Sequence, residues 1–188
     1  MPQPPSPASQ ASAAVIIMGV SGSGKSTLGG VLARALGCPF LEGDDFHDAA
    51  AVLKMSAGHP LADDDRWPWL DRLARAIGGA LARDGSAVAA CSALRRSYRD
   101  RLRAAIPAPT RFILLDPGPD ELQRRLGRRT GHYMPASLLG SQLATLERPG
   151  ADEAATALTA GGSPEQLCEA ALAWLQAGAS QTVRPLGH

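Results

Sequence analysis

A glycine-rich segment near the start of the chain has the residue types and spacing of a phosphate-binding loop. Residues 19–26 read GVSGSGKS and match the pattern G-x-x-x-x-G-K-[S/T]. In this pattern backbone N–H groups surround the phosphates, Lys25 reaches the β and γ phosphates of a nucleoside triphosphate, and the Ser26 hydroxyl binds Mg²⁺. We therefore predict ATP and Mg²⁺ as cofactors. The residues expected to hold the nucleotide are Gly19, Val20, Ser21, Gly22, Ser23, Gly24, Lys25, Ser26 and Thr27.

The lysine of this segment also stands out in the composition. Of the 19 basic residues only two are lysines, Lys25 and Lys54, and the rest are arginines. In a chain that favours arginine, a retained lysine indicates a position that needs a compact point charge, which the wide planar guanidinium cannot replace. Lys25 is therefore a candidate catalytic residue on composition as well as on spacing.

Two aspartates that follow predicted strands are candidates for activating an acceptor hydroxyl. Asp44 lies in the segment LEGDDFH, and Asp116 ends the segment FILLD. A carboxylate beside the phosphates can orient the hydroxyl, accept its proton and hold a magnesium-bound water. We favour Asp44, because Asp116 is followed at once by proline and glycine, which are typical of a turn from strand to helix. The neighbouring Asp45 is interpreted as a helix cap.

Strands that alternate with helices are expected to position these side chains. Apolar runs and helical spacing predict strands at residues 14–18, 39–41, 87–91, 112–115 and 154–159, and helices at 25–36, 66–83, 95–106, 120–126, 135–146 and 163–176, with a short helix ending near residue 55. Asp63, Asp64 and Asp65 are expected to cap the longest helix, with Pro68 in its first turn. The alternation predicts an α/β three-layer sandwich, in which a parallel sheet of about five strands is covered by helices on both faces.

Length and composition limit the class of protein. The 188 residues fit one domain, which we place at 14–178 between disordered tails at 1–13 and 179–188. A net charge of +1 argues against a general nucleic-acid binder, and no apolar run approaches the ~20 residues of a membrane span. The chain contains no asparagine, which the guanine-reading motif of GTPases requires. Three cysteines without metal-site spacing, and a start without the basic region of a signal peptide, favour a cytoplasmic location.

Several short motifs together resemble the gluconate kinase family over about residues 15–175. They are MGVSGSGKS at 18–26, EGD at 42–44 with His47, KM at 54–55, GHPL at 58–61 with DDDR at 63–66 and WL at 69–70, CSAL at 91–94 with YRD at 98–100, and GH at 131–132 with SQ at 141–142 and LE at 146–147. The resemblance implies transfer of the ATP γ-phosphoryl group to O6 of D-gluconate, giving 6-phosphogluconate and ADP. It also implies a nucleoside monophosphate kinase-like fold with a lid, and it suggests a homodimer.

The resemblance implies an acceptor pocket rich in cations and hydrogen-bonding groups, as a hydroxylated carboxylate requires. The residues assigned to substrate binding are Asp44, His47, Lys54, Asp63, Arg66, Ser92, Arg95, Tyr98, Arg99 and His132. Other interpretations stay open for three of them: Tyr98 packs a helix, Lys54 is a solvated charge, and Arg66 pairs with nearby aspartates. Cys91 is interpreted as a core residue rather than a nucleophile.

The segment RLGRRTGH at residues 125–132 is expected to belong to a lid at about 124–135. Arg125 and Arg129 match the family's spacing and are assigned to the nucleotide and the transferring phosphoryl group. Arg124 and Arg128 fall outside that spacing and are interpreted as solvated. The predicted catalytic residues are thus Lys25, Asp44 and Arg129, and the predicted Mg²⁺ ligands are Ser26 and Asp44. His132 either contacts substrate or holds the lid.

The sequence also departs from the family. Where the family has His-Pro and then an asparagine, this chain has His47-Asp48 and Ala51, which bears on the shape of the acceptor helix. Two alternatives to gluconate phosphorylation remain at this point. One is a kinase of another small acceptor, such as shikimate or a nucleoside monophosphate, and the other is a nucleotide-binding module without catalysis.

Overall fold

The centre of the molecule is a five-stranded parallel sheet. The computed structural model describes residues 12–116, 118, 137–159 and 161–181. The strands are β1 (Ala13–Met18), β2 (Phe40–Glu42), β3 (Ser86–Ala90), β4 (Thr110–Asp116) and β5 (Ala155–Thr159), and they lie in the order β2-β3-β1-β4-β5. Every neighbouring pair is parallel. The predicted α/β sandwich with five parallel strands is confirmed.

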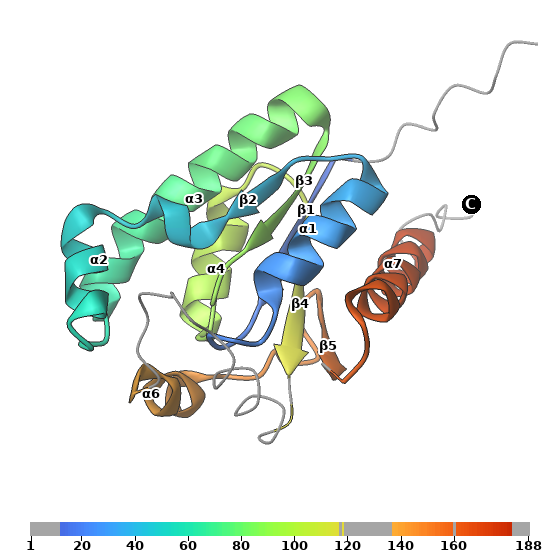
Figure 1. Cartoon of the computed structure of the whole chain (residues 1–188). Helices are drawn as coiled ribbons and strands as arrows, with labels where there is room; N and C mark the ends of the chain where they lie inside the picture. The colour runs from blue at the N-terminus through green and yellow to red at the C-terminus, as the bar shows by residue number, and fades with distance from the viewer. Residues whose placement is uncertain (1–11, 117, 119–136, 160, 182–188) are drawn as a thin grey trace, which may run out of the picture.

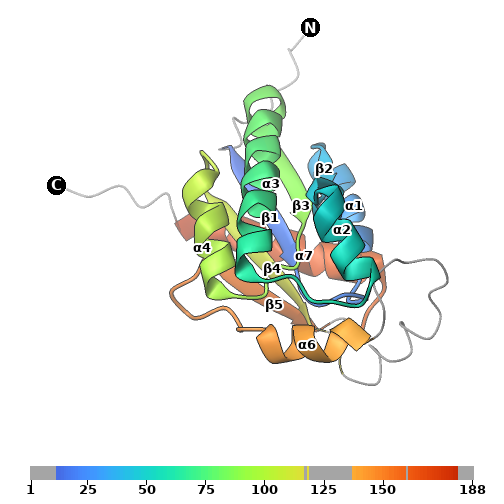
Figure 2. The ribbon, with the colours of Figure 1, turned by 90° about the vertical axis from the view of Figure 1, so that its left-hand side faces the viewer.

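Helices cover both faces of this sheet, as Figures 1 and 2 show. One face packs against α3 (Asp63–Asp84) and α4 (Arg96–Ala105), and the other packs against α1 (Lys25–Leu36) and α7 (Pro164–Gln181). Because successive side chains of a strand point to opposite faces, Ile16 of β1 lies in the first core and Ile17 in the second. Both are fully buried, which explains why the central strand is an unbroken apolar run.

Shorter elements gather beyond the carboxyl ends of the strands. A 3₁₀ turn, η1 (Gly43–Phe46), follows β2 directly and leads to α2 (Ala49–Ser56). Helix α6 (Ser137–Thr145) lies beyond the end of β4 (Figure 1). These elements surround the edge of the sheet at which a parallel α/β fold binds its ligands.

Some predicted boundaries were wrong. α3 begins at Asp63, so the three aspartates form its first turn rather than precede it, and Pro68 lies inside the helix. The cap of α2 is Asp48, whose carboxylate accepts the Ala51 N–H at 2.8 Å, whereas Asp45 lies within η1. α7 continues to Gln181, beyond the predicted end of that helix at residue 176.

Other predictions concern residues outside the described ranges. These are the helix at 120–126, the lid at about 124–135, most of the first tail and the end of the second. Within the part of the chain that is described, none of the helices combines the length and the apolar character needed to cross a membrane.

Candidate active site

The loop between β1 and α1 is shaped by glycines. Gly19, Gly22 and Gly24 have φ values of 140°, 84° and 100°, which residues other than glycine rarely adopt. At Gly19 a Cβ atom would also lie 2.7 Å from the Leu115 carbonyl oxygen, so the loop can pack this closely only without a side chain. Gly24 is the N-cap of α1, and the first turn of that helix carries no acidic residue. The positive end of the helix therefore stays available to an anion.

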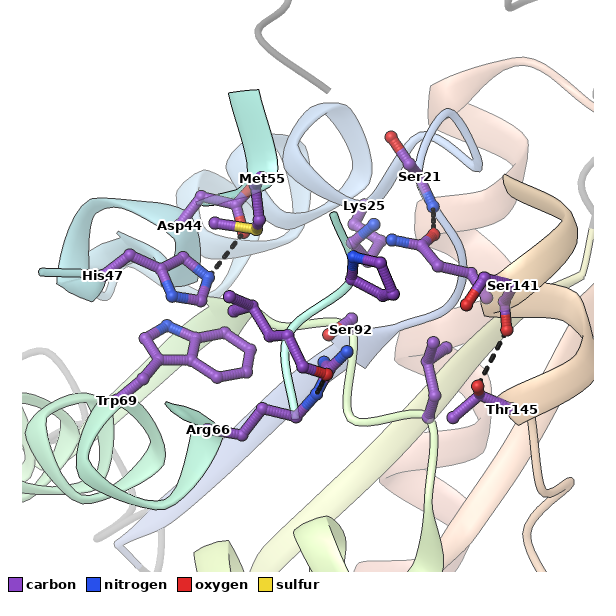
Figure 3. Close-up of a pocket in the computed structure, with 14 residues that line it drawn as sticks. Ser21, Lys25, Asp44, His47, Met55, Arg66, Trp69, Ser92, Ser141 and Thr145 are labelled. Carbon is purple, nitrogen blue, oxygen red and sulfur yellow. Dashed lines mark hydrogen bonds and ion pairs between the residues drawn. The ribbon is translucent and has the colours of Figure 1, made fainter. Parts of the chain in front are cut away.

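A pocket opens beside this loop (Figure 3). It is lined by residues from the loop, the ends of β2 and β3, α2, α3 and α6: Ser21, Lys25, Asp44, His47, Met55, Pro60, Leu61, Arg66, Trp69, Ser92, Leu94, Ser141, Gln142 and Thr145. The Lys25 ammonium donates to the Val20 carbonyl at 2.9 Å. One cavity thus joins the predicted phosphate loop to several residues predicted to bind the acceptor.

Asp44 reaches this pocket because β2 and β3 approach closely where they end. A Cβ atom on Gly43 would lie 2.1 Å from the Ala90 carbonyl oxygen, and the Trp69 indole donates to the Gly43 carbonyl at 2.7 Å. These contacts fix the backbone on which Asp44 stands, while its own side chain is 52% exposed. The rival Asp116 does not line this pocket, and it forms an ion pair with Arg148.

His47 lies against the indole of Trp69, with ring centroids 4.2 Å apart and nearly parallel planes. Its side chain is 4% exposed, and its Nε2 atom lies 4.0 Å from an Asp44 carboxylate oxygen. Burial lowers the pKa of His47 to about 4, which outweighs the opposing effect of Asp44. The imidazole is therefore neutral at neutral pH, and it can donate or accept a hydrogen bond without adding charge.

Arg66 lines the pocket and is a cation of the acceptor side. Its Nε atom donates to the Leu61 carbonyl at 3.3 Å, and its guanidinium lies 5.4 Å from the centroid of the Tyr98 ring. Among the described residues, no carboxylate forms an ion pair with it. The alternative that Arg66 only pairs with neighbouring aspartates is therefore not what the structure shows.

Other predicted acceptor residues are already paired. The Lys54 ammonium lies 2.6 Å from an Asp65 carboxylate oxygen. Arg95 donates to both carboxylate oxygens of Asp63, at 3.1 and 2.9 Å, and the Tyr98 hydroxyl donates to the same carboxylate at 2.6 Å. Burial and this hydrogen bond raise the pKa of Tyr98 to about 12, so the phenol stays protonated. None of the four predicted acceptor residues of this group lines the pocket: Lys54, Asp63, Arg95 and Tyr98.

Arg99 does not reach the pocket either, and its predicted contact with substrate needs correction. Its side chain is fully buried and forms two hydrogen bonds with Glu153, at 2.6 and 2.8 Å. Its remaining nitrogen donates to the carbonyls of Ala93, Leu94 and Glu147. Ala93 has a φ of 43°, a strained value for a residue with a side chain. Arg99 thus holds in place the loop that carries Ser92.

Sequence reasoning missed some residues of the pocket. Gln142 accepts the Ser21 backbone N–H at 2.6 Å, and Trp69 supports both η1 and His47. Both residues were among the motifs of the resemblance, but no chemistry was attached to them. Cys91 is buried, as expected, and burial raises the pKa of its thiol to about 12. Arg125, Arg129 and His132 lie outside the described residues.

Comparisons with known proteins agree with this geometry. A family model described as an AAA domain matches residues 15–149. The gluconokinase of Gluconobacter oxydans is 46% identical over 163 residues, which cover 87% of this chain and 91% of that protein. The thermosensitive gluconokinase of Escherichia coli is 46% identical over 138 residues, which cover 73% of each chain.

A solved structure gives the same result for the fold. The crystal structure of a gluconokinase from Sinorhizobium meliloti superimposes with a TM-score of 0.79 at 44% identity, and the match covers 91% of this chain and 95% of the other. The phosphate loop, the pocket beside it and relatives this similar over most of their length lead to one conclusion: this chain is a P-loop kinase of the gluconokinase family.

Proposed function

We propose that this protein transfers the γ-phosphoryl group of ATP to O6 of D-gluconate, giving 6-phospho-D-gluconate and ADP. The observation that carries this proposal is the pocket itself, which places Lys25 of the phosphate loop, the Asp44 carboxylate and the Arg66 guanidinium around one cavity. A phosphate-binding cation, a candidate base and a cation with no carboxylate partner among the described residues match a triphosphate donor and an acidic, hydroxylated acceptor.

The transfer follows from these positions. Asp44 orients the O6 hydroxyl of gluconate and accepts its proton as the bond between O6 and the γ-phosphorus forms. The bond from that phosphorus to the bridging oxygen of ADP breaks, and Lys25 stabilises the negative charge that grows on the phosphates. Arg125 and Arg129 remain proposed contacts of the nucleotide and of the transferring phosphoryl group.

Oxygen donors at and beside the pocket fit Mg²⁺, which we propose is held by Asp44 of the pocket lining and by Ser26 in the first turn of α1. Both side chains offer oxygen atoms and both are exposed to solvent. The described ranges contain no cluster of three or more acidic, histidine or cysteine side chains that could hold a metal ion. This agrees with a cation bound mainly by phosphates and water and by only one or two protein oxygens. When bound, it would neutralise phosphate charge.

On the acceptor side we propose that Arg66 binds the gluconate carboxylate, while the Ser92 hydroxyl and the neutral His47 contact its hydroxyl groups. Lys54, Asp63, Arg95 and Tyr98 are proposed to act from a second layer, since they are already bonded to one another or to Asp65. Where the family has a proline after the histidine, this chain has Asp48, whose carboxylate caps α2. We propose that this cap preserves the position of the helix.

The test is the initial rate of ADP production with gluconate, glucose, shikimate or AMP at equal concentration, beside a blank without acceptor. We expect gluconate to give the highest rate. Glucose lacks the carboxylate and should lower kcat/KM by about 10²-fold or more, because a cation is left without its partner. Shikimate should fail because its rigid ring misplaces the attacking oxygen. Equal rates with glucose or shikimate, or a rate with AMP alone, would refute the proposal.

We also propose a cytoplasmic location, which the three free cysteines support, since an oxidising compartment favours disulfides. A homodimer remains a prediction, and light scattering of the purified protein would test it.

A further inference from the structure

Gln142 makes a contact that the proposed reaction does not yet use. Its side-chain amide oxygen, on α6, accepts the backbone N–H of Ser21 at 2.6 Å, across 121 positions of the sequence. The dashed line from Ser21 in Figure 3 marks this bond. Ser21, Lys25 and Gln142 all line the pocket. The bond therefore joins α6 directly to the phosphate loop within the lining of the pocket.

Apolar contacts and a backbone hydrogen bond hold α6 and the residues that follow it against the phosphate loop and the loop after β3. Leu139 and Leu146 pack on Val20 of the phosphate loop and on Leu94 of the loop after β3. The Glu147 N–H donates to the Leu94 carbonyl at 2.8 Å. The Gln142 side chain is thus presented to the loop by a helix whose own position is fixed.

The choice of an amide at this position has a physical reason. A buried or half-buried N–H needs an acceptor, and a carboxylate would satisfy it more strongly than a neutral oxygen. However, a carboxylate here would place a negative charge on the phosphate loop, where it would repel the triphosphate that this loop is expected to bind. Glutamine provides the acceptor without the charge, which a triphosphate site requires.

We propose that Gln142 is a positioning residue for phosphoryl transfer, which fixes the Ser21 arm of the phosphate loop beside the γ-phosphate by a neutral hydrogen bond. It acts through Ser21 and does not itself supply the charge or the proton. The inference rests on the proposed kinase function only in that the pocket must hold a nucleoside triphosphate. Its identity as a gluconate kinase is not needed.

The decisive variant is Gln142→Glu, which keeps the acceptor and adds a charge. Binding of ADP and of a non-hydrolysable ATP analogue would be measured by calorimetry in the presence of Mg²⁺. We expect the analogue to lose about 10-fold more affinity than ADP, because only the triphosphate has a γ-phosphate near the new charge. Equal losses for the two nucleotides, or no loss, would overturn the proposed placement.

Gln142→Ala tests the positioning role without a change of charge. We expect kcat to fall about 3- to 10-fold, the cost of one neutral hydrogen bond, while the affinity for ADP changes less than the rate. A kcat equal to that of the wild type, or a loss confined to ADP affinity, would refute the role. Leu143→Ala is the matched control, since this neighbouring side chain is exposed and does not line the pocket.

Circular dichroism and thermal melting would show that each variant folds. If the wild type binds the ATP analogue but does not phosphorylate gluconate, the proposed function fails while the two binding measurements still decide the role of Gln142.

Discussion

The two sides of the pocket are built in different ways. On the phosphate side, glycine backbone and a helix N-terminus supply the donors, and Lys25 is bonded to a loop carbonyl of its own segment. On the acceptor side, side chains form the structure, and three of the predicted cations are paired with carboxylates: Lys54 with Asp65, Arg95 with Asp63, and Arg99 with Glu153. A site made from backbone can be located from its motif. In a site made from side chains, the residues left to bind a ligand are those whose charges are not already paired within the protein.

Arg66 is the residue on which this comparison depends. It lies on α3 next to Asp65, yet it donates to a carbonyl and lies over an aromatic ring. If the comparison is right, activity depends on Lys25 and Arg66 directly, and on the paired cations only through the structure they hold. Five substitutions test this difference.

The largest effect is expected from Lys25→Ala. Its ammonium becomes more important as the phosphoryl group leaves ADP, so kcat should fall by about 10³-fold. The measurement is steady-state ADP production at saturating ATP and gluconate. Arg34→Ala, an exposed change in the last turn of the same helix, is the control. Near-normal turnover of a folded Lys25→Ala protein would falsify the assignment.

Glu153→Gln should instead act on stability. Without its carboxylate Arg99 becomes an unpaired buried charge, which costs about 3–5 kcal/mol of unfolding free energy at neutral pH. The Arg99 guanidinium lowers the pKa of Glu153 from 4.5 to about 2, so this stabilisation is present above pH 4.5 and is lost as the pH falls through 2. Urea unfolding at several pH values should show that the difference in unfolding free energy between the wild type and Glu153→Gln decreases as the pH falls from 4.5 to 2.

The control for that experiment is Glu169→Gln on the exposed side of α7, which should leave the stability unchanged. A gap that stays constant from neutral pH to pH 2 would contradict the assigned ion pair.

Arg66→Ala should lower kcat/KM for gluconate by about 10²-fold, through loss of a charge-assisted bond to the carboxylate. Lys54→Ala should lower it only about 3-fold or less, because this ammonium is paired with Asp65 and does not line the pocket. Measuring both variants with gluconate at fixed ATP compares the two cations directly. A larger effect of Lys54→Ala would reverse their roles.

The smallest effect is expected from Asp48→Ala, which removes the cap of α2 and its ion pair with Arg72. Loss of a helix cap should lower Tm by about 2–4 °C in a chain of this size. Asp45→Ala should leave Tm unchanged, because Asp45 does not cap α2. Calorimetric melting of the two variants side by side would show whether Asp48 has replaced the proline of the family.

Much of the fold could be predicted because local signals and tertiary structure agree. The helix from Lys25 to Leu36 begins after the glycine loop and ends at Gly37, whose φ of 65° favours glycine. The strands were recognisable as apolar runs, since a parallel sheet buries both faces. The phosphate loop was predictable for the same reason, because its function depends on consecutive backbone groups.

The acceptor side was less predictable because its contacts join distant parts of the chain. Arg99 and Glu153 are separated by 54 positions, and nothing in a single sequence pairs them. A clue to the burial of Arg99 was available, since the large side chains of Tyr98 and Leu102 lie one and three positions away on a predicted helix, and both are buried in the structure. Asp48 directly precedes an apolar helix, a capping signal that was assigned to Asp45 instead.

The order of the strands also determines when the protein becomes active as it is made. β1 and its phosphate loop leave the ribosome before β3 and β4, but the partners of Ala14 in the sheet are Ala87 and Thr110. Pairing strands so far apart requires long loops to close first, which slows folding relative to chains with mostly local contacts. A growing chain therefore contains the complete phosphate loop before the sheet that positions it has formed. Activity should arise only when β3 and β4 have paired with β1.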